Sequence, residues 1–443
     1  MPEISIPDLY TLFQKHPEIC TDTRKIISGS LFFALRGEKF NGNSFAEKAI
    51  SEGAAYAIVD DPSLPDRKEF LKVPDALKAL QDLARMHRSM LTIPFIGITG
   101  SNGKTSTKEI TRDILSTKYK TFATQGNLNN HIGVPISILS IKEDIEIAVI
   151  EMGANHIGEI AFLSEIARPD YGLITNIGKA HLEGFGGIEG VKKGKSELYQ
   201  YIEKHSGKIF VNRDNATLTG LIKTADTQTY GTSGPCNILG RLISEFPKLV
   251  FRWKSNKDAE TLDEKENIET RISGSYNLEN VLAGICIADY FSVSARDINE
   301  AVKNYIPGNM RSEEIKTKRN QIFLDAYNAN PSSMEKAIKH FSGLEGNSKL
   351  AVLGDMLELG DYAEEEHKAI IELLRQSSIS EAILIGPVFS KVYKSKKGEK
   401  VRVFENTDAA LKSLKPELKA LKGKMVLVKG SRGLALENLS SLL

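Results

Sequence analysis

The chain has 443 residues and a formal net charge of +1, with 41% hydrophobic and 26% charged residues. This length suggests about two to four domains, and the composition is that of an ordinary globular protein. The near-zero net charge argues against a protein that binds nucleic acid through bulk electrostatic attraction.

Residues 1–92 are predicted to form a small mixed domain. The apolar runs LFFAL (31–35) and AAYAIVD (54–60) are typical of short buried strands, and DALKALQDLARMHRSM (75–90) has helical periodicity. Pro94 follows this helix and marks the expected boundary to the next domain.

Residues 93–306 are predicted to form a central α/β domain. Its continuous apolar runs FIGIT (95–99), IEIAVIE (145–151) and YGLITN (171–176) end in polar residues. Such runs suit buried parallel strands, with ligand groups at their carboxyl ends. Further along the chain we expect a strand at 208–211, a half-exposed antiparallel strand at 248–253 and a helix at 275–291.

Strand and helix patterns start to alternate afresh after Pro307, so residues 307–443 are predicted to form a third, doubly wound α/β domain. The strand candidates in this segment are residues 321–327, 350–355, 382–386 and 425–430.

The strongest local pattern is ITGSNGKTSTKEI, in which a strand is followed by a turn with Gly100 and Gly103 and by a helix expected over 103–117. Backbone N–H groups and the dipole at a helix start favour phosphate, and glycine lets the backbone approach phosphate oxygens closely. Lys104 would then reach the β- and γ-phosphates, and the Thr105 hydroxyl would bind Mg²⁺.

This loop departs from the common GxxxxGK[ST] pattern, because Ile98 stands where the first glycine is required. The departure argues against a generic GTPase or transporter ATPase. The residues predicted to hold the phosphates of ATP are Thr99, Gly100, Ser101, Asn102, Gly103, Lys104, Thr105 and Ser106.

Several motifs together resemble the Mur ligase family. They are TGSNGKT, TQGNLNNHIGVP (124–135), EMGANHIGEI (151–160) and TNIGKAHLEGFG (175–186). Three more motifs resemble the branch that adds D-alanyl-D-alanine: DAYNANPSSM (325–334), GDMLELG (354–360) and KGSRG (429–433). The similarity runs from Thr21 to Gly433, nearly the whole chain.

The resemblance implies a ligase that uses ATP to join D-alanyl-D-alanine to UDP-N-acetylmuramoyl-tripeptide through an acyl phosphate, in peptidoglycan synthesis. It implies three α/β domains: a small mixed amino-terminal domain for the UDP-muramoyl substrate, a central P-loop-type ATP-binding domain, and a Rossmann-like carboxyl-terminal domain for the acceptor. Two Mg²⁺ ions are expected with the ATP.

The resemblance also implies the metal ligands. Glu151, at the end of an apolar run, is expected to bind Mg²⁺ together with Thr105; the alternative is an acid that only stabilises a helix amino terminus. His181, in a glycine-rich loop, is implied to bind a second Mg²⁺.

Lys195 matches the lysine that the family carbamylates with CO₂, and a carbamate supplies an oxygen anion that a hard divalent metal prefers. This chain has KGKSE where many relatives have KxKGE, and the alternative is a solvated helix lysine beside Lys192 and Lys193. Asn130 is expected to contact the transferred phosphate or the substrate, with Asn129 and His131 as competing choices.

The nucleotide's other contacts follow from the same resemblance. Asn277 and Asn280, on one face of the predicted helix, are expected to meet adenine, since an amide can both donate to and accept from a purine edge. Arg311 is expected to reach the nucleotide from the third domain, and Asp325 to bind ribose hydroxyls. Helix capping is the alternative for the two asparagines.

The two other substrates are assigned by motif. Thr23 and Arg24 are expected to bind the UDP part of the precursor, because a hydroxyl and a guanidinium suit uracil, ribose and pyrophosphate. The expected contacts of D-alanyl-D-alanine are Asn328, Asn330, Asp355 and Glu358. An acid among them could orient the ammonium group or accept its proton, and the sequence does not single one out.

The amino-terminal segment has acids and prolines where a signal peptide needs an apolar run, and no apolar run reaches the roughly 20 residues that cross a bilayer. The three cysteines, Cys20, Cys236 and Cys286, are far apart and lack CxxC spacing, which argues against disulfides or a cysteine-based zinc site. We expect a cytoplasmic monomer that binds small molecules, without membrane insertion or nucleic acid.

Other interpretations remain at this point. A Mur ligase that adds one amino acid and a folylpolyglutamate synthetase are enzyme alternatives, and the DAYNANP and GDMLELG motifs argue against both. A nucleotide-gated binding protein without turnover and a generic P-loop motor are further alternatives.

Overall fold

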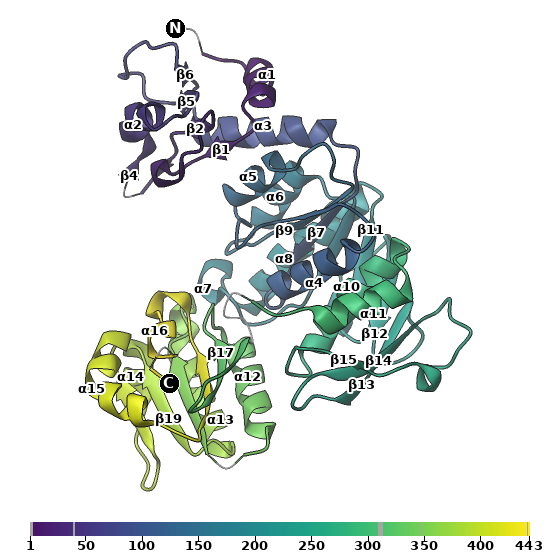
Figure 1. The fold of residues 1–443 in the computed structure, drawn as a ribbon, viewed down its shortest axis with the longest axis vertical. Helices are drawn as coiled ribbons and strands as arrows, with labels where there is room; N and C mark the ends of the chain where they lie inside the picture. Colours follow the sequence, from purple (N-terminus) through teal and green to yellow (C-terminus); the bar gives the residue numbers. More distant parts are fainter. Residues whose placement is uncertain (1–2, 39, 309–312, 347, 441) are drawn as a thin grey trace.

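The computed structural model describes residues 3–38, 40–308, 313–346, 348–440 and 442–443. Three larger sheets follow one another along the chain, and each has helices packed on it. The amino- and carboxyl-terminal units lie at opposite ends of the middle unit (Figure 1). The predicted α/β fold with three sheet-based units is confirmed.

The amino-terminal unit has a four-stranded parallel sheet of order β1-β2-β5-β6. Its strands are β1 (Ile19–Cys20), β2 (Leu31–Phe33), β5 (Tyr56–Val59) and β6 (Phe70–Lys72), beside the hairpin of β3 (Arg36–Gly37) and β4 (Phe40–Asn41). Its helices are α1 (Ile6–Lys15), α2 (Ala46–Ser51), α3 (Ala76–Met90) and the short 3₁₀ turns Thr23–Lys25 and Gly42–Phe45. The long helix α3 joins this unit to the middle one, because it packs on α1 and also on α5 and α6 (Figure 1).

The middle unit has a nine-stranded sheet of order β15-β14-β13-β12-β11-β10-β7-β9-β8. Its strands are β7 (Phe95–Thr99), β8 (Thr121–Ala123), β9 (Ile147–Glu151), β10 (Tyr171–Ile174), β11 (Lys208–Asn212), β12 (Asp226–Gly231), β13 (Ile238–Ser244), β14 (Val250–Ser255) and β15 (Ile268–Glu269). The strands from β8 to β13 are parallel, whereas β14 is antiparallel to both of its neighbours.

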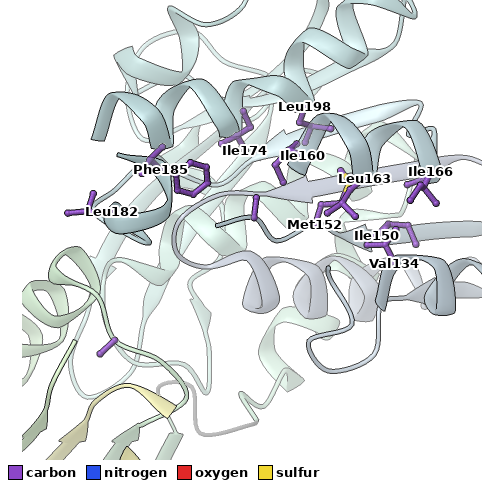
Figure 2. Packing of buried hydrophobic residues seen from close by; sticks show 14 of the residues in the cluster. Val134, Ile150, Met152, Ile160, Leu163, Ile166, Ile174, Leu182, Phe185 and Leu198 are labelled. Atoms are coloured by element: carbon purple, nitrogen blue, oxygen red, sulfur yellow. The ribbon is translucent and has the colours of Figure 1, made fainter. Parts of the chain in front are cut away.

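Helices cover both faces of this sheet. They are α4 (Lys104–Leu115), α5 (Gly133–Leu139), α6 (Glu159–Ala167), α7 (Leu182–Phe185), α8 (Ile188–Lys204), α9 (Ala216–Thr219), the 3₁₀ turn Leu262–Glu264, α10 (Asn277–Tyr290) and α11 (Ala295–Asn304). Side chains alternate between the two faces along a strand, so Ala148 and Ile150 of β9 lie in a core with α5, α6 and α8, while Ile147 and Val149 lie in a second core with α4 and α10. Figure 2 shows part of the first core, including Val134, Ile150, Leu163 and Leu198.

The carboxyl-terminal unit has a six-stranded sheet of order β16-β17-β21-β18-β19-β20, parallel except for β16. Its strands are β16 (Glu313–Lys316), β17 (Gln321–Asp325), β18 (Lys349–Gly354), β19 (Glu381–Ile385), β20 (Val401–Phe404) and β21 (Met425–Lys429). Its helices are α12 (Pro331–Gly343), α13 (Ala363–Gln376), α14 (Pro387–Val392), α15 (Thr407–Ala420), α16 (Glu437–Ser440) and the 3₁₀ turns Gly360–Tyr362 and Arg432–Leu434. Because α12 and α13 pack on one face and α15 and α16 on the other, the predicted doubly wound arrangement is confirmed.

Among the described residues, no helix is long and apolar enough to span a bilayer.

Candidate active site

A cleft of about 630 Å³ lies between the middle and carboxyl-terminal units. The middle unit lines it with the loop after β7, the residue that ends β9, and the start of α10; the carboxyl-terminal unit lines it with the ends of β17 and β21. The carboxyl ends of parallel strands are where α/β proteins bind ligands. Predicted site residues on its wall are Ser101, Asn102, Gly103, Lys104, Thr105, Ser106, Asn130, Glu151, His181, Asn277, Asn280, Asp325, Asn328 and Asn330.

The phosphate loop needs glycine at two positions. Gly100 has φ 143°, and a Cβ there would lie 2.0 Å from Oγ1 of Thr175. Gly103 caps α4 with φ 78°, and a Cβ there would lie 2.4 Å from Oδ1 of Asn280. Only glycine tolerates both the positive φ and the close approach, so the tight turn before α4 follows directly from the sequence. Thr99, buried at the end of β7, supports this turn by donating from its hydroxyl to the Met152 carbonyl (2.7 Å).

Lys104 lies over this loop at the first turn of α4. Its Nζ donates hydrogen bonds to the carbonyl oxygens of Gly100 (2.7 Å) and Ser101 (3.3 Å). Thr105, next to it, is buried and lines the cleft. A helix start of this kind presents backbone N–H groups and a cation to an anion.

Glu151 ends β9, and its side chain is almost completely buried, with 1% exposed. Nδ2 of Asn129 donates a 2.7 Å hydrogen bond to its Oε1. Its Oε2 has no hydrogen-bond partner among the described residues and lies 3.7 Å from Nζ of Lys108. A buried oxygen without a hydrogen bond is costly, so a cation bound there would supply the interaction that this oxygen lacks.

Asn130 lines the cleft, but its side chain caps a helix. Its Oδ1 accepts hydrogen bonds from the backbone N–H groups of Ile132 (3.1 Å) and Gly133 (2.8 Å) at the start of α5. The amide that contacts the acid is therefore Asn129, which the sequence left as a competing choice. The two asparagines are adjacent, and no feature of the motif distinguishes which one faces Glu151.

His181 meets Glu358 across the two units. The ring nitrogen Nδ1 of His181 is in hydrogen-bonding contact with Oε2 of Glu358, and this contact is the main cause that lowers the pKa of the Glu358 carboxyl below its usual value. Both residues have positive φ, 53° for His181 and 61° for Glu358. The sequence assigned these two residues to different substrates, whereas the structure brings them together.

Lys195 lies in the middle of α8 and is 1% exposed. Its Nζ donates to the carbonyl oxygen of Ala154 (3.1 Å) and lies 5.2 Å from the ring centroid of Phe185. Burial, followed by the charge of Lys104, holds the pKa of the Lys195 amine well below its usual value. The alternative of a solvated lysine is therefore wrong. Lys195 stands behind the cleft wall, which its partner Ala154 lines.

Asn277 and Asn280 form a hydrogen-bonded chain at the start of α10. Nδ2 of Asn280 donates to Oδ1 of Asn277 (3.1 Å), and Nδ2 of Asn277 donates to the Ser273 carbonyl (2.8 Å). Oδ1 of Asn280 accepts from the Thr107 hydroxyl (3.2 Å), which ties α10 to α4. Both asparagines are buried beside the phosphate loop, so neither is a surface amide. Arg311 lies outside the described residues.

The carboxyl-terminal unit contributes the opposite wall. Asp325 ends β17 and pairs with Lys429, while Asn328 lies in the loop that follows. Asn330 caps α12 and donates from Nδ2 to Oδ1 of Asn102 (2.8 Å), so the phosphate loop of one unit touches the other unit directly.

Three predicted residues do not reach this cleft. Asp355 is fully buried, and its carboxylate accepts from the backbone N–H groups of Val388 (2.8 Å) and Phe389 (2.9 Å) at the start of α14. The expectation that it faces the acceptor is corrected, because both oxygens are used inside the fold. Thr23 and Arg24 lie in the amino-terminal unit, where the exposed Arg24 pairs with Asp22.

The described residues contain no group of three or more His, Cys, Asp and Glu side chains that could hold a metal on their own. The Thr105 hydroxyl and the Glu151 carboxylate are hard oxygen donors of the kind that Mg²⁺ takes together with nucleotide phosphates. The residues present therefore fit a nucleotide-dependent cation better than a metal site built from protein alone.

Family models match three successive parts of the chain. The model described as "Mur ligase family, catalytic domain" matches residues 17–88, "Mur ligase middle domain" matches residues 98–288, and "Mur ligase, glutamate ligase domain" matches residues 310–432.

Individual proteins match almost the whole chain. It is 36% identical over 430 residues to a UDP-N-acetylmuramoyl-tripeptide--D-alanyl-D-alanine ligase of Bacillus subtilis (strain 168), which covers 95% of this chain and 92% of that protein. The fold superposes on MurF from Acinetobacter baumannii with a TM-score of 0.84 at 30% identity, covering 96% of this chain and 92% of that one. MurF ligase from Thermotoga maritima in complex with ADP gives a TM-score of 0.82 at 26% identity, covering 96% of both chains.

Proposed function

The chain belongs to the Mur ligase family, and we propose that it joins D-alanyl-D-alanine to UDP-N-acetylmuramoyl-tripeptide at the expense of ATP. The products are ADP, phosphate and UDP-N-acetylmuramoyl-pentapeptide, a precursor of peptidoglycan. The observation that carries this function is the 36% identity over 95% of the chain to a ligase of that name.

The geometry of the cleft suits an acyl-phosphate route. The tripeptide carboxylate attacks the γ-phosphorus of ATP, the bond to the β-phosphate oxygen breaks, and ADP leaves. The amine of D-alanyl-D-alanine then attacks the acyl carbon, loses a proton and displaces phosphate. Lys104 and the helix start behind it stabilise the charge on the phosphates. The two units enclose the cleft, which excludes water from an intermediate that water would hydrolyse.

Each unit has a separate part in this proposal. Residues 1–92 bind the UDP end of the precursor, with Thr23 and Arg24 as contacts. Residues 93–306 bind ATP, and residues 307–443 bind the acceptor with Asn328, Asn330 and Glu358. The amide pair Asn277 and Asn280 meets the adenine. These assignments are supported by the order of the matching family models along the chain.

Thr105 and Glu151 would hold Mg²⁺ beside the phosphates, and His181 would hold a second ion after it exchanges its contact with Glu358. A divalent cation in this place supplies neutralisation of phosphate charge. Lys195 is proposed to carry a carbamate, which forms when its amine adds to CO₂ and loses a proton. Its burial supports this, because a neutral amine is the form that reacts.

We further propose that the protein acts in the cytoplasm as a monomer, since its nucleotide-linked substrates are made there and the cleft is lined by residues of one chain.

ADP release and product mass, measured with the purified protein, test the function directly. The mixture contains ATP, Mg²⁺, UDP-N-acetylmuramoyl-tripeptide and D-alanyl-D-alanine, and each component is omitted in turn. The expected product is the pentapeptide, formed only when all are present. ADP release without the muramoyl substrate would favour a generic ATPase, and tight nucleotide binding without ADP release would favour a binding protein.

A further inference from the structure

We propose that Lys429 is a positioning residue for the sugar of the nucleotide: it holds the Asp325 carboxylate and the loop after it in the orientation that accepts hydrogen bonds from the ribose hydroxyls. The inference rests on the proposed ATP-dependent function, and it extends the role of Asp325 to a residue of another strand.

The two residues are neighbours by strand register. β17 and β21 are parallel and adjacent, and Asp325 pairs with Lys429 at the last position of each strand. Side chains at paired positions of neighbouring strands lie on the same side of the sheet. Nζ of Lys429 therefore reaches Oδ2 of Asp325 at 2.5 Å, at the strand ends that line the cleft.

The pair is open on one side only. The Lys429 side chain is 1% exposed, whereas the Asp325 side chain is 22% exposed. Among the residues that the structure describes, Lys429 alone donates a hydrogen bond to this carboxylate, through Oδ2. The other oxygen is thus available to the cleft. An ionised carboxylate accepts hydrogen bonds and donates none, which matches the two hydroxyl donors of a ribose.

Lys429 also fixes the loop that follows Asp325. Its Nζ donates to the Asn328 carbonyl at 3.2 Å. Two residues later, Asn330 caps α12 and donates to Asn102 of the phosphate loop at 2.8 Å. A single buried ammonium therefore connects the acid, the loop and the contact between the two units.

A buried lysine is an expensive way to fill a strand position. The other residues of β21 are apolar, Met425, Val426, Leu427 and Val428, and an apolar side chain at the last position would avoid the desolvation cost of the ammonium. The charge at this position is therefore better explained by what it holds than by packing.

The same sheet contains a matched control. Lys349 is also buried, with 3% exposed, but it lies at the opposite, amino end of β18. Its Nζ donates to the Ser342 carbonyl (2.6 Å) and to the Ser378 hydroxyl (3.0 Å), so it contacts neither an acid nor the cleft. Lys349→Met removes a buried ammonium from this sheet without touching the nucleotide side.

The test compares nucleotides that differ in the sugar. Affinities of ATP, 2′-deoxy-ATP and 3′-deoxy-ATP are measured by calorimetry on the full chain, and kcat and KM for each are measured by ADP release. In the unmodified protein we expect ATP to bind about tenfold or more tightly than either deoxy form, since hydrogen bonds to a charged group are worth about 1.5–3 kcal/mol.

Lys429→Met should weaken ATP binding about tenfold and bring the ratio between ATP and the deoxy forms close to one, with a larger effect on KM than on kcat. Asp325→Asn should lower the same ratio, and the double variant should add little to either single change. Lys349→Met should keep the ratio, even if it unfolds at a lower temperature. Should Lys429→Met fail to fold, Lys429→Gln, which keeps a donor for Asn328, decides by the same ratio.

An unchanged ratio in Lys429→Met or Lys429→Gln would overturn the inference, as would an equal loss of the ratio in Lys349→Met. Failure of the proposed function looks different, because the unmodified protein would then release no ADP while the binding ratios could still be measured.

Discussion

Nδ2 of Asn129 donates a 2.7 Å hydrogen bond to Oε1 of Glu151, and this contact determines how the carboxylate at the end of β9 is turned. The other oxygen, Oε2, is left facing Lys108 at 3.7 Å without a hydrogen bond among the described residues. The acid proposed to bind Mg²⁺ is therefore oriented by the residue before Asn130, and Asn130 itself caps α5.

Asn129→Ala should lower ADP release about tenfold or more and raise the Mg²⁺ concentration needed for half-maximal rate, because the Glu151 carboxylate loses the donor that orients it. Asn130→Ala should instead lose about 1 kcal/mol of folding stability, the usual cost of a helix cap, with a smaller loss of rate. Mg²⁺ titrations and thermal unfolding of both variants provide the check. The reverse order, with Asn130→Ala more harmful to the rate, would restore Asn130 as the contacting residue.

Lys104→Ala should remove ATP turnover, by about a hundredfold or more, and leave the fold intact. The expected loss reflects one charged contact to the phosphates in the transition state, whereas the folded protein loses only two hydrogen bonds to loop carbonyls, on Gly100 and Ser101. ADP release measures the first effect, and circular dichroism with thermal unfolding measures the second. Turnover close to that of the unmodified protein would contradict the phosphate-loop assignment.

The acceptor should be a dipeptide. We expect D-alanyl-D-alanine to be used far better than D-alanine or glutamate, because a site built for both ends of a dipeptide leaves polar groups unpaired when half of the ligand is missing, and such losses discriminate by orders of magnitude. Initial rates of ADP release with each amine, with product masses, measure this preference. Equal rates with single amino acids would move the protein to another branch of the family.

The sequence predicted the sheets well where strands are continuous apolar runs, as in β7, β9, β18 and β21, because such runs are buried on both faces. It did not predict β8, β12 and β20, which are short or only partly buried, so the apolar pattern is weak. Burial by neighbouring strands forms these elements.

Site prediction succeeded where one motif holds consecutive residues, as in the phosphate loop, because its geometry follows from two glycines and a helix start. It was less accurate where the fold decides which side chain faces the cleft. Asp355 lies in a motif beside Glu358, yet only Glu358 reaches His181, while Asp355 caps α14. That difference depends on how two units pack, which local sequence does not encode.

Lys195 should be carbamylated in the active enzyme. Its amine is buried in the middle of α8 and donates to the Ala154 carbonyl, behind the cleft wall, in a segment that matches the modified lysine of the family. A free ammonium near Mg²⁺ would be repelled, whereas a carbamate oxygen would bind it. Lys195→Ala should therefore lose most activity, and a short-chain carboxylic acid should restore part of it by supplying an oxygen anion.

Lys193 provides the control for this experiment, since it lies on the same helix but is exposed. Lys193→Ala should keep its activity, and neither it nor the unmodified protein should gain activity from the added acid. A carbon-13 spectrum of protein prepared with labelled bicarbonate should show one carbamate signal that disappears in Lys195→Ala and persists in Lys193→Ala. Full activity of Lys195→Ala together with no carbamate signal in the unmodified protein would refute the modification, and it would leave the phosphate loop and Glu151 in place, because their contacts do not involve Lys195.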